Sequence, residues 1–216
     1  MRKVLGLVVS AVLGVVACSD DGSLGGGSAD NSGNNPPANS SSGNTTTTPP
    51  NVSNDPTVTA KTTETVEGDI TASRTLDASK NWLLKGLVQV KAGQTLTIEK
   101  GTTLFGDNAS KAILLVEPGA KIIAEGTADE PIVFTSQAPE GSKRAGDWGG
   151  IVLLGKAPVN IPGGKGNIEG ILKTVSGTEY GGTDPNDNSG VLKYVRVEYA
   201  GIVLSQDNEV NGITFG

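Results

Sequence analysis

The sequence is poor in the residues from which many metal and catalytic sites are built. It has no histidine and one cysteine, and its aromatic residues are two Trp, three Tyr and three Phe. Zinc and transition-metal sites are therefore not expected, because they usually draw on clusters of histidine and cysteine. A single cysteine cannot form a disulfide within the chain. The formal charge of −6 argues against a nucleic-acid partner, since binding to phosphates depends on Lys and Arg.

The one cysteine lies at the end of the first apolar stretch. Residues 1–18 begin with two basic residues and continue with an uncharged apolar run, residues 4–16, before the small residue Ala17 and then Cys18. This order is typical of a secretory signal. The run is shorter than the about 20 residues that a transmembrane helix needs. We therefore predict that residues 1–18 are an export signal that is removed.

The end of this signal, Val-Val-Ala-Cys at residues 15–18, resembles the lipobox of bacterial lipoproteins. The resemblance implies that the thiol of Cys18 is alkylated with diacylglycerol and that its new amine is acylated after cleavage, so that the chain carries palmitate-type lipid. Acyl chains contribute about 0.8 kcal/mol per buried methylene and hold a protein durably in a membrane. The alternative is a conventional signal peptide with an incidental cysteine.

The residues after the cysteine bear on localisation. Ser19, in place of an aspartate, resembles the lipoproteins that are passed on to the outer membrane. Ser19, Asp20 and Asp21 together resemble a short acidic signal that sends lipoproteins to the outer face of that membrane. We expect an outer-membrane lipoprotein that faces the cell exterior. On the alternative view the acidic residues only solvate the start of a tether, and the chain faces the periplasm.

Residues 19–57 consist almost entirely of Ser, Thr, Asn, Gly and Pro. Such a segment buries too little apolar surface to offset the entropy that ordering costs, so we predict a disordered tether. A flexible chain of this length spans roughly 35 Å, from about 5 to 6 Å times the square root of the residue number. The tether would therefore lift the following domain away from the lipid headgroups.

Residues 58–216 change to short alternating apolar runs separated by glycines, with no helical pattern. Residues 87–104 alternate on either side of a turn at Gly93, and residues 113–127 repeat this plan. The corresponding residues are Val90 and Val116, Gly93 and Gly119, Leu96 and Ile122, Ile98 and Ala124, and Glu99 and Glu125. A strand pair that recurs at this interval predicts a β-solenoid, whose rungs bury apolar faces against their neighbours. An antiparallel sandwich of regular hairpins is the alternative.

Further rungs are expected towards the C-terminus. Residues 146–155 predict a rung that is entered through a glycine-rich corner, with Trp148 covering an edge of the core. Residues 192–204 predict a strand with Val195 and Val197 on one side. The tetrapeptides Glu-Tyr-Gly-Gly, at 179–182, and Glu-Tyr-Ala-Gly, at 198–201, predict equivalent places in successive rungs.

Five sequence segments together resemble a known protein family. They are NWLLKGLVQVKAGQTLTIEKGTTLFGD, ADEPIVFTS, GDWGGIVLLGKAPVN, GGTDPNDNSGVLKYVRVEYAG and NGITFG. In this order they resemble a large family of bacterial cell-surface lipoproteins with a pectin-lyase-like right-handed parallel β-helix, over about residues 64–216. The resemblance implies an all-β solenoid for residues 58–216 but little chemistry. It also implies a longer protein, because the sequence stops in mid-strand, and we expect the domain to be truncated at its C-terminus.

The sharpest cluster of polar ligands lies in residues 181–190. Asp184, Asn186 and Asn188 fall at alternate positions, and Asp187 adds a carboxylate. Calcium takes six to eight oxygen ligands at 2.3 to 2.6 Å, so this loop is a candidate calcium site, and calcium is the one cofactor considered. The same residues are the ordinary residues of a tight loop, and that alternative stays open.

The sequence identifies no catalytic residue. Its acidic residues include Asp147, Glu179, Asp184, Asp187, Glu198 and Asp207, and no pair stands out. Glu99 and Glu125 are expected on a solvated face of adjacent rungs. Tyr180 is the aromatic candidate for stacking on a sugar. We therefore expect a domain for adhesion or for binding glycan or matrix. The alternative is a polysaccharide lyase or glycoside hydrolase with part of its site beyond residue 216.

Overall fold

The computed structural model describes residues 61–171, 174–205 and 208–216. Within these ranges every regular element is a strand, and no helix there is long and apolar enough to cross a bilayer. The predicted export signal and tether fall outside the described ranges, as do lipidation at Cys18 and sorting by Ser19, Asp20 and Asp21. Those predictions remain expectations from the sequence.

The strands follow one another with short or long connections. In chain order they are β1 (Thr63–Ile70), β2 (Arg74–Leu76), β3 (Asn81–Val90), β4 (Thr95–Ile98), β5 (Thr103–Gly106), β6 (Ile113–Val116), β7 (Lys121–Glu125), β8 (Ile132–Ser136), β9 (Gly150–Leu153), β10 (Gly166–Asn167), β11 (Glu179–Tyr180), β12 (Gly190–Lys193), β13 (Val195–Val197), β14 (Ile202–Ser205), β15 (Asn208–Val210) and β16 (Ile213–Phe215).

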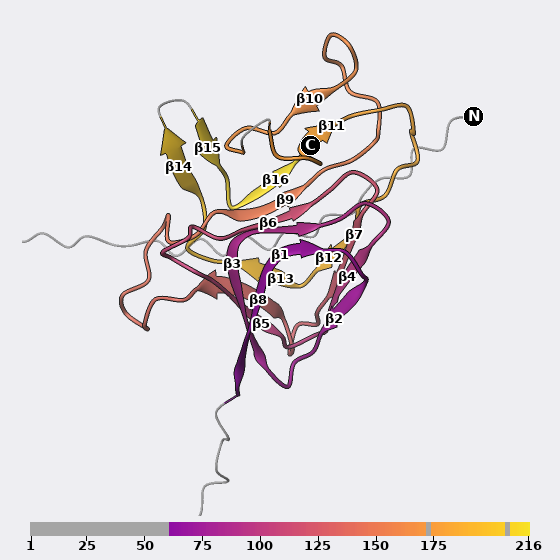
Figure 1. Cartoon of the computed structure of the whole chain (residues 1–216). Helices are drawn as coiled ribbons and strands as arrows, with labels where there is room; N and C mark the ends of the chain where they lie inside the picture. The colour runs from indigo at the N-terminus through magenta and orange to yellow at the C-terminus, as the bar shows by residue number, and fades with distance from the viewer. Residues whose placement is uncertain (1–60, 172–173, 206–207) are drawn as a thin grey trace, which may run out of the picture. The chain divides into compact units, whose positions relative to one another are not determined.

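Parallel pairing arranges these strands as a solenoid with three faces, which Figure 1 shows as the sides of a triangle. Face 1 contains the first parts of β1 and β3, then β5, β8 and β13. Face 2 contains the second parts of β1 and β3, then β6, β9 and β16. Face 3 contains β2, β4, β7 and β12. The parallel β-helix is therefore confirmed, and the antiparallel sandwich is excluded.

Face 1 and face 2 share a sheet because β1 and β3 bend at a glycine. Gly68 and Gly86 have φ angles of 69° and 64°, in the left-handed region that favours glycine. Before Gly86, β3 pairs with β5, and after it β3 pairs with β6. The Gly86 N–H donates to the hydroxyl of Ser110 on the next rung at 2.8 Å. One strand thus turns the corner between two faces.

The core is made of side chains stacked in register along the solenoid. On face 2 one inward column consists of Ile70, Val90, Val116 and Leu153. On face 3 another column consists of Leu76, Ile98, Ala124 and Leu192. The expected repeat is confirmed, because the corresponding residues pair directly and the Gly93 N–H donates to the Gly119 carbonyl at 2.9 Å. Fully burying one such aliphatic side chain contributes about 1.5 to 3 kcal/mol.

The outer surface of face 2 is also apolar. Every residue of β6 and of β9 is buried, which explains why their sequences read as continuous apolar runs rather than alternating ones. Leu115 and Val152 point outward and join Ile168, Ile202 and Val210 in a second buried cluster. Since the last three residues come from long connections, those connections cover this face as a second layer.

Three expectations about the later rungs are wrong. Glu179 and Glu198 are not equivalent, because Glu179 begins β11 of an antiparallel pair whereas Glu198 follows β13. Residues 192–197 are not one strand: Tyr194, at φ 49°, forms a corner between face 3 and face 1. Trp148 does not cover an edge but is fully buried, stacked on Phe134 with ring centroids 6.4 Å apart. A period of two in the sequence cannot reveal corners at which the chain changes face.

Candidate functional site

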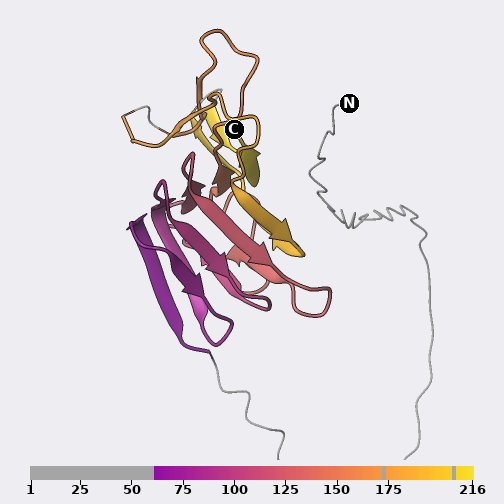
Figure 2. The same cartoon turned by 90° about the vertical axis from the view of Figure 1, so that its right-hand side faces the viewer.

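Two long connections depart from the regular rungs on the side of face 2. The first insertion is residues 154–189, between β9 and β12, and it carries the antiparallel pair β10–β11. The second insertion is residues 198–212, between β13 and β16, and it carries the antiparallel pair β14–β15. Figure 2 shows both gathered at the end of the solenoid where the last rungs lie.

The two insertions contact each other closely. The Gly170 N–H donates to the side-chain oxygen of Asn208 at 2.8 Å. Gly170 has a φ of 80°, and a Cβ there would lie 2.5 Å from Cγ2 of Val210, so only glycine allows this approach. Ile168 and Val210 are buried in the same cluster. The insertions therefore form one unit on the outer surface of face 2.

A buried ion pair fixes the first insertion to the rungs below it. The carboxylate of Glu117, only 7% exposed, forms a salt bridge with Lys91 and accepts from the Ala92 N–H at 3.1 Å. Nε2 of Gln89 donates to Glu117 at 3.2 Å and to the Ser176 carbonyl at 2.9 Å. The hydrogen bond that the Lys91 amine donates to the Glu117 carboxylate is the main reason that the pKa of Lys91 is raised above its usual value. The network ties residues of the insertion to two rung corners.

A cleft of about 260 Å³ lies where the two insertions meet the last rung. It is lined by Asn167, Ile168, Glu169, Tyr180, Glu209, Asn211, Thr214 and Phe215. The lining comes from β10, β11, β15 and β16 and from the chain beside them. The cleft thus combines two aromatic rings, two amides and two carboxylates, a set that can contact both the apolar and the hydroxyl faces of a sugar.

Tyr180, the residue predicted to stack on a sugar, is in the wall of this cleft. Its ring is half-buried and lies against Gly166, where a Cβ would be 2.7 Å from Cζ. Gly166 and Tyr180 are also paired across β10 and β11. Because Gly166 has no side chain, the ring of Tyr180 can pack directly against the neighbouring strand.

The candidate calcium loop returns the chain from the first insertion to β12. Asp184 accepts from the Asn186 N–H at 2.9 Å, and Asp187 accepts from the Lys156 N–H at 2.8 Å. Asn188 accepts from the Gly190 N–H at 2.8 Å. These side chains thus serve the backbone of a turn. The described residues contain no group of three or more acidic residues, cysteines or histidines placed to hold a metal ion. Calcium binding at this loop stays a prediction.

The other acidic candidates lie apart from the cleft. Glu99, directly after β4, and Glu125, the last residue of β7, are exposed as expected. Glu179 pairs with Lys165 at 2.6 Å, and Glu198 pairs with Arg196 at 2.8 Å. Asp207 falls outside the described ranges.

Asp147 belongs to a corner rather than to a site. It accepts from the Ser136 hydroxyl at 2.5 Å and from the Arg144 N–H at 3.0 Å. These hydrogen bonds, with that from Ser136 foremost, hold the pKa of Asp147 below its usual value. The bond to Ser136 joins the connection before β9 to the end of β8.

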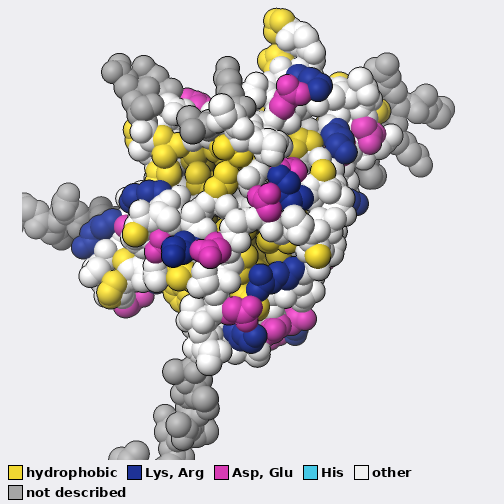
Figure 3. Space-filling view, viewed as in Figure 1, with side chains coloured by type: hydrophobic (Ala, Val, Ile, Leu, Met, Phe, Trp, Pro, Cys, Tyr) yellow, Lys and Arg dark blue, Asp and Glu magenta, His cyan; other side chains and the backbone are white. Residues whose placement is uncertain are grey.

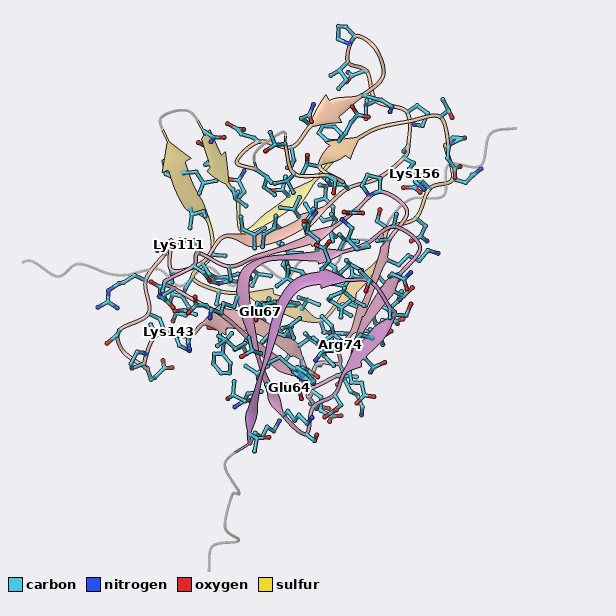
Figure 4. The ribbon with its side chains drawn as sticks, viewed as in Figure 1. Glu64, Glu67, Arg74, Lys111, Lys143 and Lys156 are labelled. Carbon is cyan, nitrogen blue, oxygen red and sulfur yellow. The ribbon has the colours of Figure 1, made fainter. Side chains whose placement is uncertain are left out.

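Charged side chains elsewhere have structural partners. On the first rung, Glu64 pairs with Arg74 at 2.9 Å and with Lys80 at 2.7 Å, and both cations lie over the Trp82 ring. Figure 4 shows Glu64 and Arg74 near each other on that rung, with Lys111 on the opposite side. The Lys111 amine donates to the Gly146 carbonyl at 2.8 Å. Figure 3 shows both signs of charge interspersed over this surface rather than gathered into one patch.

The cleft residues that the sequence analysis did not single out are those beside Tyr180. Glu169 and Glu209 lie in two segments that read only as glycine-rich or acidic loops. Nothing in their spacing indicates that they meet, because they are brought together by contacts between the two insertions.

The family model for the pectate-lyase-like β-helix domain matches residues 68–216. The chain belongs to this family. The match spans all rungs from the second part of β1 onward and includes both insertions. No curated protein and no solved structure matches the chain. Membership of the pectate-lyase-like β-helix family confirms the fold that the resemblance implied, and the chemistry has to be argued from the cleft.

Proposed function

We propose that this pectate-lyase-like β-helix domain binds glycan and is displayed on the cell exterior by a lipid on Cys18. The cleft beside Tyr180 is the observation that carries the binding part of the proposal. Glycan binding needs an apolar platform for the C–H face of a sugar and polar groups at its edge for the hydroxyls. The half-buried ring of Tyr180 supplies the platform, and exposed Asn167 and Asn211 supply donors and acceptors.

The form of the cleft suits a polymer better than a small free ligand. With about 260 Å³ it is smaller than the about 300 to 1,000 Å³ of pockets that enclose drug-sized ligands. Its lining includes side chains that are well exposed, such as Phe215 at 61%. A solenoid also presents an extended surface to a long partner. We infer that the cleft holds one part of a chain that continues across the surface.

Binding is tested with the full chain on an array of polysaccharides. Tyr180→Ala should lower the affinity for any bound glycan about tenfold, because the packing of a sugar ring against an aromatic ring is worth on the order of 1 kcal/mol. Asn211→Ala, at an exposed position, should weaken binding without affecting thermal unfolding. Tyr194→Ala is the matched control, since this tyrosine is exposed at a corner between face 3 and face 1. Equal losses for Tyr194→Ala and Tyr180→Ala would contradict the proposal.

The proposed display of the domain on the cell exterior rests on the sequence of residues 1–21. It is tested in a separate experiment. Cells expressing the tagged chain are labelled with palmitate and then treated with external protease. Label on the protein and loss of the tag would support a lipoprotein on the cell exterior. Label with full protection would instead place the chain on the periplasmic face. Cys18→Ser should abolish the label, and a label that persists in this variant would contradict lipidation at Cys18.

Glycan hydrolysis is a second candidate because Glu169 and Glu209 line the same cleft. Retaining and inverting hydrolases use two carboxylates about 5 to 10 Å apart. The test is the release of reducing ends from every glycan that binds. Activity that is lost in Glu209→Gln while binding persists would establish hydrolysis. Binding without product by the wild-type chain would leave the binding proposal as it stands.

A further inference from the structure

The charge of the cleft points to the class of glycan that it accepts. Among its described lining residues the charged side chains are Glu169 and Glu209, and both are exposed. No described lining residue is Lys or Arg. A ligand in this cleft therefore meets carboxylates, which accept hydrogen bonds and donate none while they are ionised.

The described lysines of the first insertion lie outside the cleft. The Lys165 amine pairs with Glu179 at 2.6 Å, and Lys156 lies over Gly119 on a corner of the solenoid. Neither lysine lines the cleft. Lys173 falls outside the described ranges, so the experiment below includes it.

We propose that the cleft accepts uncharged glycans and rejects polyuronates. This inference rests on the proposed glycan binding. The hydroxyls of a neutral sugar can donate to Glu169 and Glu209, so both partners gain hydrogen bonds. A uronate replaces a hydroxyl donor with a second acceptor and adds a like charge, which is repelled at short range. The ligand class thus differs from the polyuronate pectate after which the family is described.

The probes are neutral oligosaccharides and their counterparts oxidised at C6, in which a carboxylate replaces the primary hydroxyl on the same backbone. Binding to the full chain is measured in the presence of a calcium chelator. We expect each neutral glycan that binds to exceed its oxidised form at least about tenfold at low ionic strength, and the ratio to shrink at high ionic strength as screening increases. Polygalacturonate should not bind.

Paired variants show whether the cleft causes the selection. Glu169→Gln combined with Glu209→Gln should raise binding of the oxidised glycans about tenfold relative to the neutral ones, because the local repulsion is removed. Glu99→Gln combined with Glu125→Gln changes the net charge equally at exposed positions on face 3 and should leave the ratio unchanged. Lys173→Gln should not alter the rejection of oxidised glycans.

The outcomes separate the inference from the proposed function. Wild-type binding of oxidised glycans or polygalacturonate as tightly as neutral glycans would overturn the inference while glycan binding stands. Polyuronate binding that appears only with calcium would also overturn it, since the carboxylates would then recruit a cation. An equal effect of the control pair would assign the selection to net charge and overturn the role of the cleft. Absence of all glycan binding would overturn the proposed function itself.

Discussion

The early and late rungs of this solenoid share one pattern of parallel pairing but differ in the length of the connections between their strands. From β1 to β7 the corners between faces are short, and the insertions are absent. From β8 to β16 the corners of face 2 expand into residues 137–149, 154–189 and 198–212. The strands nevertheless stay in register, so that Leu153 pairs with Val116 below it and with Phe215 above it. The stack supplies the scaffold, and its late corners supply the cleft.

The largest expected effect tests the stack itself. Leu114→Ala removes a fully buried side chain that pairs with Val88 on one side and Ile151 on the other. We expect a loss of about 2 to 5 kcal/mol in the free energy of unfolding, measured with urea, because a cavity remains between rungs. Ile123→Ala, at a half-buried outward position of face 3, should cost less than half of this. Equal losses would contradict the assignment of inward and outward faces.

A smaller effect is expected where the early and late parts interlock. Gly106 ends β5, and a Cβ there would overlap the indole ring of Trp148 from the connection before β9. Gly106→Ala should therefore destabilise the domain by about 1 to 3 kcal/mol through overpacking, seen as a lower calorimetric transition temperature. Gly141→Ala, which has a φ of 78° and nothing within 4 Å, should show only backbone strain of about 1 kcal/mol. A neutral Gly106→Ala would show that this packing is not tight.

The third prediction distinguishes the local stability of the first insertion from that of the rungs. Glu117→Gln leaves a similar shape but removes the charge that faces Lys91, at a cost of about 1 to 3 kcal/mol for the disrupted buried hydrogen bonds. We expect faster hydrogen exchange in residues 166–180 than in β4 and β7. Glu130→Gln, in an exposed pair with Lys100, should cost less than about 1 kcal/mol. Uniformly faster exchange across all rungs would argue that Glu117 supports the whole solenoid.

The smallest effect concerns the pH dependence of the corners. Asp107 and Asp147 have pKa values below their usual value, owing first to hydrogen bonds from Ser110 and Ser136 respectively. The folded state therefore binds fewer protons than the unfolded state, and stability should fall as the pH drops below about 4. Asp107→Asn combined with Asp147→Asn should flatten this fall, measured by thermal unfolding from neutral to acid pH. An unchanged pH profile would show that these corners do not control it.

The regular rungs could be predicted from the sequence because their information is local. The alternation around Gly93 and its repeat around Gly119 specify which residues stack, and the pairing of Leu96 with Ile122 follows that prediction. Tyr180 could be named as a candidate because the chain has few aromatic residues. Its neighbours Glu169 and Glu209 could not be named, because their proximity depends on contacts between two insertions rather than on a period.

The errors have the same physical origin. Glu179 and Glu198 lie in similar tetrapeptides, but one belongs to an antiparallel pair within an insertion and the other follows a rung. The continuous apolar runs in β6 and β9 signal burial on both sides, yet they do not say which segment covers the outer side. Non-local packing decides both questions.

Face 2 is buried on both its inner and its outer surface, and this arrangement limits how its connections can change in sequence. Because β9 and β16 pair directly, the two insertions, residues 154–189 and 198–212, can lengthen or be replaced without altering the hydrogen-bond ladder, as long as β12 and β13 between them are kept. The requirement is only that a replacement supplies apolar residues where Ile168, Ile202 and Val210 now cover Leu115 and Val152. The scaffold can thus accept loops of other sequence, provided that each loop supplies the apolar residues that cover the outer surface of face 2.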